Sequence, residues 1–272
     1  MTQAKKQFTA VVLAGDRGPQ DSLVLAAGVS SKALVPIAGR SMILRVLDTL
    51  AASPAIGARI VCGSSPRLLQ QEPELAQLVS EGVVRWLENE SSPSMSARAC
   101  LETIPADQPV LLTTADHALL SPQMVEDFCA RAGGTGCDVV AALAPAELVM
   151  KAFPEGRRTI TRLRGGSYCG CNLFAFLTPR GRRAAPFWHR IEEQRKHPLR
   201  IVRTLGMSSV VLYLLGRLTL EQGLERLSTA MDARAGAVWM TEAEAAVDVD
   251  KVADWRLVGK ILAARQRSPS AP

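Results

Sequence analysis

Glycine and basic residues follow the first apolar run of the chain. Residues Ala10 to Ala14 are apolar, Gly15 ends the run, and the polar stretch behind it carries Arg17 and, further on, Lys32. This pattern predicts a buried strand followed by a loop. In such a loop, glycine lets backbone N–H groups approach phosphate oxygens, arginine supplies a planar fork of donors and lysine a mobile charge. Arg17 and Lys32 are therefore candidate ligands of a polyphosphate.

A carboxylate ends the most apolar run in the middle of the chain. Residues Val110 to Leu112 continue through two threonines to Asp116. If this run is a strand, Asp116 lies at its carboxyl edge, where open α/β sheets bind ligands. A carboxylate there is costly to desolvate unless it binds something. The alternative is that Asp116 caps the helix predicted to begin at Ser121 and Pro122, and His117 beside it is interpreted as a hydrogen-bonding residue of the loop.

Two further segments contain residues suited to binding. Near the end of the sequence, Asp248 and Asp250 alternate along a predicted strand, so their side chains are expected to point the same way, with Asp254 in the first turn of the next helix. In the middle, a serine-rich loop precedes a predicted helix, and Ser94 or Ser96 is expected to be its N-cap.

These blocks together resemble the signatures of nucleotidyltransferases, the molybdopterin-guanylyltransferase-like and sugar-phosphate nucleotidyltransferase-like enzymes with a glycosyltransferase-A-like fold. Leu13 to Arg17, followed by Lys32 to Pro36 and Gly39, is similar to the pattern Leu-Ala-Gly-Gly-x-x-x-Arg and Pro-Lys-x-Leu. The strand ending at Asp116 and the Asp-Val-Asp of residues 248–250 resemble the acidic signatures. The blocks occur in the family's order along nearly the whole chain.

The resemblance implies roles for particular residues. The nucleotide-binding residues would be Leu13, Ala14, Gly15, Ser94 and Ser96; Arg17 and Lys32 would be catalytic; Gly170 and Asn172 would bind the acceptor; Asp116 and Asp250 would bind Mg²⁺ or Mn²⁺. Asp248 remains the alternative to Asp250 as the second metal ligand.

The implied activity is the transfer of a nucleoside monophosphate from a nucleoside triphosphate to a phosphorylated sugar, alcohol or cofactor, with release of pyrophosphate. Asp16 stands where the pattern has a second glycine, and Ser31 where it has proline. These replacements motivate an alternative, a catalytically degenerate relative that binds nucleotides or regulates. A dehydrogenase is not favoured, because no G-x-G-x-x-G follows the first predicted strand.

Apolar periodicity predicts one α/β domain over residues 1–264, with a Rossmann-like, mainly parallel mixed sheet and helices on both faces. An insert over about 151–234 is expected to hold a hairpin, with turns near 155–156 and 165–166, and a helical region. The stretch 18–30 is expected to be a long loop, the first helix to span 42–50, and residues 265–272 to form a disordered tail.

Composition and charge narrow the classes of partner. The 272 residues are 47% hydrophobic and only 4% aromatic, which favours an aliphatic core of strands and helices. A net charge of +6 suits anionic partners, but the arginine-rich region lacks aromatic residues for stacking bases, so nucleic acid is not expected. The basic helical region 180–220 is interpreted as a solvated face, with an anionic membrane or a second subunit as alternatives.

The cysteines and the N-terminal residues indicate a compartment. The six cysteines have no zinc-site spacing, and the polar first residues contain no apolar core of a signal peptide. We therefore expect a cytoplasmic protein with reduced cysteines.

Overall fold

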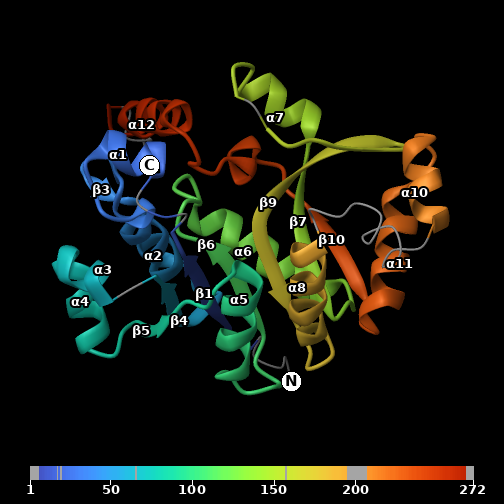
Figure 1. The fold of residues 1–272 in the computed structure, drawn as a ribbon, viewed down its shortest axis with the longest axis horizontal. Coiled ribbons are helices and arrows are strands. Elements are labelled where there is room, and N and C mark those ends of the chain that lie inside the picture. Colours follow the sequence, from blue (N-terminus) through green and yellow to red (C-terminus); the bar gives the residue numbers. More distant parts are fainter. Residues whose placement is uncertain are drawn as a thin grey trace.

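The first apolar run forms strand β1 (Phe8–Ala14), and all seven of its residues are buried. In this computed structural model, which describes residues 6–16, 18, 20–64, 66–156, 158–194 and 207–267, β1 lies in the middle of the main sheet (Figure 1). It pairs in parallel with β4 (Ile56–Gly63) on one side and β6 (Val110–Thr114) on the other. A strand covered on both faces needs a continuous apolar run, and this is what the sequence shows.

The main sheet is mixed but mainly parallel. The other strands are β2 (Pro36–Ile37), β3 (Arg40–Ser41), β5 (Arg85–Glu88), β7 (Val139–Pro145), β8 (Thr161–Leu163), β9 (Gly166–Phe176) and β10 (Ala235–Trp239). Among the described residues the main sheet has eight strands, in the order β10-β7-β9-β6-β1-β4-β5 with β8 paired to β9, while β2 and β3 form a separate hairpin. β9 is antiparallel to its neighbours, and the other pairs are parallel. The predicted sheet type is confirmed.

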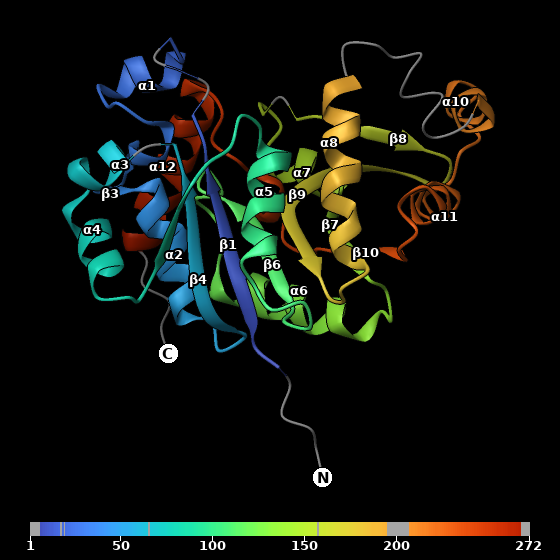
Figure 2. The ribbon, with the colours of Figure 1, turned by 60° about the horizontal axis from the view of Figure 1, so that its bottom comes forward.

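Helices cover both faces of this sheet, as predicted. They are α1 (Ser22–Ala27), α2 (Met42–Ala52), α3 (Pro66–Gln71), α4 (Pro73–Ser80), α5 (Pro93–Glu102), α6 (Pro122–Gly134), α7 (Ala146–Ala152), α8 (Ala184–Gln194), α10 (Met207–Leu214), α11 (Leu220–Met231) and α12 (Val252–Arg267), with 3₁₀ helices η1 (Lys32–Leu34), η2 (Gly181–Arg183) and η3 (Ala243–Ala246). One apolar cluster joins the sheet to α5 and α8, which lie in front of the strands in Figure 2. The other joins it to α2, α6 and α12.

The prediction of a plain loop over residues 18–30 is wrong, because α1 lies within it. The side chain of Asp21 caps the first turn by accepting from the N–H of Leu23, and Gly28 ends the helix in the left-handed conformation with φ of 67°. Leu23 and Val24 are buried. A helix of six residues is too short to show helical periodicity, so its caps were the only signal.

The prediction of a hairpin over residues 147–164 is only partly correct. Residues 146–152 form α7, with Glu147 in its first turn. The hairpin follows it and joins β8 to β9, with a turn at Gly165, where φ is 95°. Strand-like alternation and a short helix cannot be distinguished over so few residues.

The described part of the basic region 180–220 is mostly helical, in η2, α8 and α10, with a non-helical stretch at residues 215–219, and residues 195–206 lie outside the described residues. Phe187 of α8 is buried, and Trp188 packs against the same cluster, so the apolar side of this helix faces the sheet. For α8, this packing does not support the membrane and subunit alternatives, while Leu214 and Leu215 at the end of α10 are exposed. No helix in the described part of the chain is long and apolar enough to cross a membrane.

At the C-terminal end, α12 continues through Arg265 to Arg267, which were expected in the tail. Residues 268–272 lie outside the described residues. The extent of the insert, 151–234, stays a prediction.

Candidate functional site

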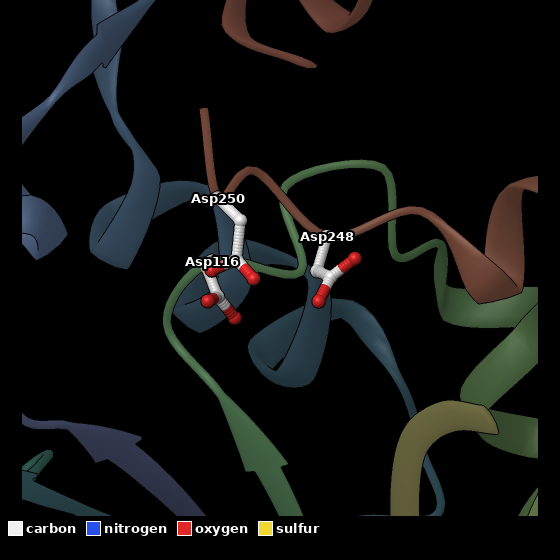
Figure 3. Close-up of side chains that lie close together, drawn as sticks. All are labelled: Asp116, Asp248 and Asp250. Atoms are coloured by element: carbon white, nitrogen blue, oxygen red, sulfur yellow. The ribbon is translucent and has the colours of Figure 1, made fainter. Parts of the chain in front are cut away.

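Three carboxylates converge beyond the carboxyl end of β6. Asp116 follows this strand, and Asp248 and Asp250 lie between η3 and α12, with all three side chains grouped in Figure 3. One oxygen of each lies within 4.8 Å of the others. The backbone explains the meeting, because the N–H of the buried Val249 donates to the carbonyl of Asp116 at 3.0 Å. The two distant segments are thereby joined at the site.

Two expectations about this cluster are corrected. Residues 248–250 are not a strand, since the N–H of Val249 bonds to the loop after β6; both aspartates nevertheless lie near Asp116. Asp116 does not cap α6, because the side chain of Ser121 does so by accepting from the N–H of Met124. The predicted place of Asp254 in the first turn of α12 is confirmed.

The ammonium group of Lys32 lies between two of these carboxylates. It donates to Oδ2 of Asp116 and to Oδ1 of Asp250, each at 2.5 Å, and the lysine side chain is only 8% exposed. Burial alone would lower the pKa of Lys32, but the adjacent Asp116 and Asp250 outweigh it and raise the pKa above 10.5. Lys32 is therefore charged and acts as an internal counter-ion for like charges that repel.

The cluster suits a divalent cation. Hard cations such as Mg²⁺ and Mn²⁺ prefer oxygen ligands, and oxygens that lie within 4.8 Å of one another can share one ion after small adjustments to ligand distances of about 2.0–2.4 Å. Burial raises the pKa of Asp248 above 3.8, and the negative charges of Asp116 and Asp250 raise it further. The second effect reflects an excess of negative charge in the cluster. A divalent cation would neutralise that excess.

The loop after β1 is held by Asp16. Its Oδ1 accepts from the hydroxyl of Ser31 at 2.9 Å and from the backbone N–H of Lys32 at 2.8 Å, and its Oδ2 accepts from Ser64. Asp16 and Ser31 thus form a matched pair, and together they fix the position of the Lys32 backbone.

Three of the other predicted nucleotide-binding residues lie in the described part of the chain. Leu13 and Ala14 are buried in β1, so their side chains face the core, while Gly15 is exposed at the end of the strand. Arg17 lies outside the described residues.

The serine hydroxyls of the serine-rich segment form hydrogen bonds with other groups of the protein. The N-cap of α5 is Ser92, not Ser94 or Ser96, because Pro93 occupies the first helical position. The hydroxyl of Ser94 is buried against α8, bonded to Glu192 and lying 3.1 Å from Nδ1 of His189. The hydroxyl of Ser96 accepts from the N–H of Glu90 and donates to Ser92, each at 2.9 Å. Both serines therefore shape this loop.

Asn172 reaches the acidic cluster from β9. It has a positive φ of 47° where the pairing of β7 and β9 is irregular, and such a bulge re-aims a side chain. Its Nδ2 donates to Oδ2 of Asp248 at 3.4 Å. Gly170 is exposed nearby on the same strand, with open space where a Cβ would lie.

Sequence reasoning missed Arg158 and did not predict that His117 is buried. Arg158 is 6% exposed and lies 3.4 Å from Asp248 and 3.2 Å from Asp254, although the sequence places it in a basic stretch typical of a surface. The only signal that could have indicated Arg158 is that buried carboxylates need a positively charged partner. His117 lies in the loop after β6, as predicted, and is buried there; burial lowers its pKa to about 4, so it is neutral.

Comparisons with known proteins identify the family and support the fold. A family model described as the MobA-like NTP transferase domain matches residues 10–235. A hypothetical transferase from Thermus thermophilus is 30% identical, with 92% of this chain and 99% of that chain covered and a TM-score of 0.76. A search of curated proteins gave no match.

Two other solved structures share the fold at low identity. CMP:2-keto-3-deoxy-manno-octonic acid synthetase complexed with CTP is 15% identical, covering 96% of this chain and 100% of that chain with a TM-score of 0.58. The 4-diphosphocytidyl-2C-methyl-D-erythritol synthase of Anaerococcus prevotii is 12% identical, covering 95% and 96% with a TM-score of 0.56.

Proposed function

The chain belongs to the family of MobA-like NTP transferases, as its signatures predicted, and on this premise we propose that it transfers a nucleoside monophosphate from a nucleoside triphosphate to a phosphorylated small molecule. The observation that carries the proposal is the convergence of Lys32 with Asp116, Asp248 and Asp250 at the carboxyl edge of the sheet. Such an edge is where α/β sheets bind ligands.

The triphosphate is bound by the loop after β1. Leu13, Ala14 and Gly15 offer their backbone, and Arg17 and Lys32 neutralise phosphate charge. The segment at the start of α5 borders the nucleotide; the hydroxyls of Ser94 and Ser96 hold this segment in shape. Asp16 supports this arrangement by holding the backbone of Lys32.

Asp116 and Asp250 are the proposed ligands of Mg²⁺ or Mn²⁺. A bound ion would supply positive charge that offsets the negative charge of the reacting phosphates. The ammonium of Lys32 lies between the oxygens of the same two carboxylates. Lys32 must therefore leave them when the cation binds, and the triphosphate is a suitable new partner for its charge.

The reaction itself is a substitution at phosphorus. An oxygen of the acceptor phosphate forms a bond to the α-phosphorus while the bond to the β-phosphate oxygen breaks, and pyrophosphate leaves with the electron pair. The acceptor oxygen is already anionic at neutral pH, so positioning and charge neutralisation are what the protein must supply. Gly170 and Asn172 are the proposed acceptor contacts. We propose a cytoplasmic reaction, in keeping with the free cysteines of the described residues.

Two measurements on the full chain test this function. Binding of each of the four nucleoside triphosphates is measured with Mg²⁺ or Mn²⁺, and pyrophosphate release is then followed with a panel of phosphorylated sugars, alcohols and cofactors. We expect one triphosphate to be preferred and one acceptor class to release pyrophosphate. Binding without release across the panel would favour the degenerate, nucleotide-binding relative, and no binding at all would contradict both.

A further inference from the structure

Arg158 places a buried positive charge beside the acidic cluster. It lies in the chain between α7 and β8, far in sequence from the carboxylates. Its Nη1 is 3.4 Å from Oδ1 of Asp248 and 3.3 Å from the Asp248 carbonyl, and its Nη2 is 3.2 Å from Oδ1 of Asp254. One guanidinium therefore bridges two aspartates that flank Asp250 in the sequence.

This arrangement of Arg158 contributes little to the stability of the folded protein. Nη2 of Arg158 forms its ion pair with Asp254 without the geometry of a hydrogen bond, and Nε has no acceptor among the described residues, although both atoms are buried. A buried charge with incomplete hydrogen bonding recovers little of its desolvation cost. Such a cost is typical of functional sites, where a charge is kept for its effect on neighbouring groups.

Within the acidic cluster, the residue that Arg158 contacts is Asp248. Its two carboxylate oxygens face different donors, Oδ1 towards Arg158 and Oδ2 towards Nδ2 of Asn172 at 3.4 Å. Without these contacts the carboxylate would turn away from Asp116 and Asp250, because like charges repel. Asn172 is aimed by an uncommon backbone conformation, with φ of 47°, which is also a sign of a functional constraint.

We infer that Arg158 is a positioning residue, which together with Asn172 holds the carboxylate of Asp248 towards the cation site as a third oxygen ligand beside Asp116 and Asp250. The inference rests on the proposed function for the identity of the site. It predicts that geometry, and not only charge, matters at position 158, because the planar fork of arginine can reach two carboxylates while lysine presents a single point charge.

The test measures direct binding of Mn²⁺ alone to the full chain. Binding is monitored through the electron paramagnetic resonance signal of the free Mn²⁺. Arg158→Lys keeps the charge, and we expect it to weaken binding by about tenfold or more, the usual effect of removing a group that orients a ligand. Arg40→Lys is the matched control, since Arg40 also bridges two carboxylates, Asp48 and Glu74, but in an exposed network that includes none of the three aspartates of the cluster.

A double variant shows whether Arg158 acts through Asp248. Arg158→Lys combined with Asp248→Asn should bind Mn²⁺ no more weakly than Asp248→Asn alone. Additive losses, or wild-type or tighter binding in Arg158→Lys, would overturn the inference. If Arg158→Lys does not fold, Asn172→Gly tests the other oxygen of Asp248, keeps the positive φ, and should weaken binding severalfold; unchanged binding would again overturn it. No Mn²⁺ binding by the wild-type protein would instead count against the metal site itself.

Discussion

Lys32 occupies the position that a metal ion is expected to take. Its ammonium is 2.5 Å from oxygens of both Asp116 and Asp250. An ammonium and a metal ion cannot both lie between these oxygens, so the metal-free protein carries its own cation. At the residue scale, the structure therefore predicts competition between Lys32 and metal for the same carboxylates.

Replacing Lys32 by methionine removes the competitor and one positive charge. We expect Lys32→Met to bind Mn²⁺ alone at least about tenfold more tightly, since two unit charges 4 Å apart interact by about 4 kcal/mol at an effective dielectric constant of about 20. Transfer activity should fall, because the triphosphate loses a counter-charge. Lys6→Met, which breaks an exposed pair with Asp107, is the control. An unchanged Mn²⁺ affinity in Lys32→Met would show that the lysine does not compete.

Replacing Asp116 by asparagine should separate catalysis from folding. The hydroxyl of Thr114 donates to Oδ1 of Asp116 at 2.5 Å, a contact that the amide oxygen can keep, and the loss of one of three adjacent charges relieves repulsion. We expect the melting temperature without metal to change little, because the relieved repulsion offsets the loss of one of the two ion pairs of Lys32, while turnover falls by about 10³-fold or more, since a bridging metal contributes several kcal/mol. Asp107→Asn, in an exposed carboxylate, should change neither. An Asp116→Asn protein that fails to fold would indicate a structural role instead.

At the element scale, Asp138 joins the segments around β7, β9 and β10. It accepts from the hydroxyl of Thr178 at 2.7 Å and from the N–H of Arg234 at 2.8 Å. Burial alone would raise the pKa of Asp138, but the hydrogen bonds from Arg234 and Thr178 outweigh it and hold the pKa below 3.8. The ionised carboxylate therefore stabilises the folded state at neutral pH.

Asp138→Asn should lower the free energy of unfolding by about 2–4 kcal/mol at pH 7, because hydrogen bonds to a buried charged group are lost. A folded pKa below the unfolded value of 3.8 means that this contribution is present above pH 3.8 and is lost as the pH falls through the folded pKa. Urea unfolding of both proteins across this range measures it. Asp127→Asn, which breaks an exposed pair with Arg131, should cost under about 1 kcal/mol; an Asp138→Asn difference that does not shrink in acid would contradict the account.

The sequence predicted the elements with long apolar runs and missed the short ones. β1 and β6 were found because strands buried on both faces are continuously apolar. α1 and α7 were missed because six or seven residues show no clear period. The position of β9 between β6 and β7 depends on pairing between distant segments, which no local pattern contains.

The same distinction applies to the site. Asp116 and Asp250 were predicted from the end of an apolar strand and from the family resemblance, and the structure brings both near one point. Arg158 was missed because its sequence neighbours resemble a surface, and only the fold places it beside Asp248. Asp16 was interpreted as a departure from the signature, yet its contacts with Ser31 and Lys32 show a matched replacement.

At the scale of the whole molecule, the described groups that we assign to the reaction meet at one edge of the sheet. The loop after β1, the aspartate after β6, the bulge of β9 and the segment before α12 meet there, although they come from the two ends and the middle of the chain. Membership in the NTP transferase family and this convergence lead to the same central claim. We propose that the acceptor phosphate attacks the α-phosphorus, not the γ-phosphorus, of the bound nucleotide.

Following the fate of labelled phosphates tests that claim most directly. The full chain is incubated with Mg²⁺, the acceptor that releases pyrophosphate, and the preferred nucleoside triphosphate labelled either at the α- or at the γ-phosphate. The account predicts that the α-label appears in the acceptor product and the γ-label in pyrophosphate, in equal amounts. Transfer of the γ-label to the acceptor, or release of the γ-label as inorganic phosphate with no labelled product, would contradict it.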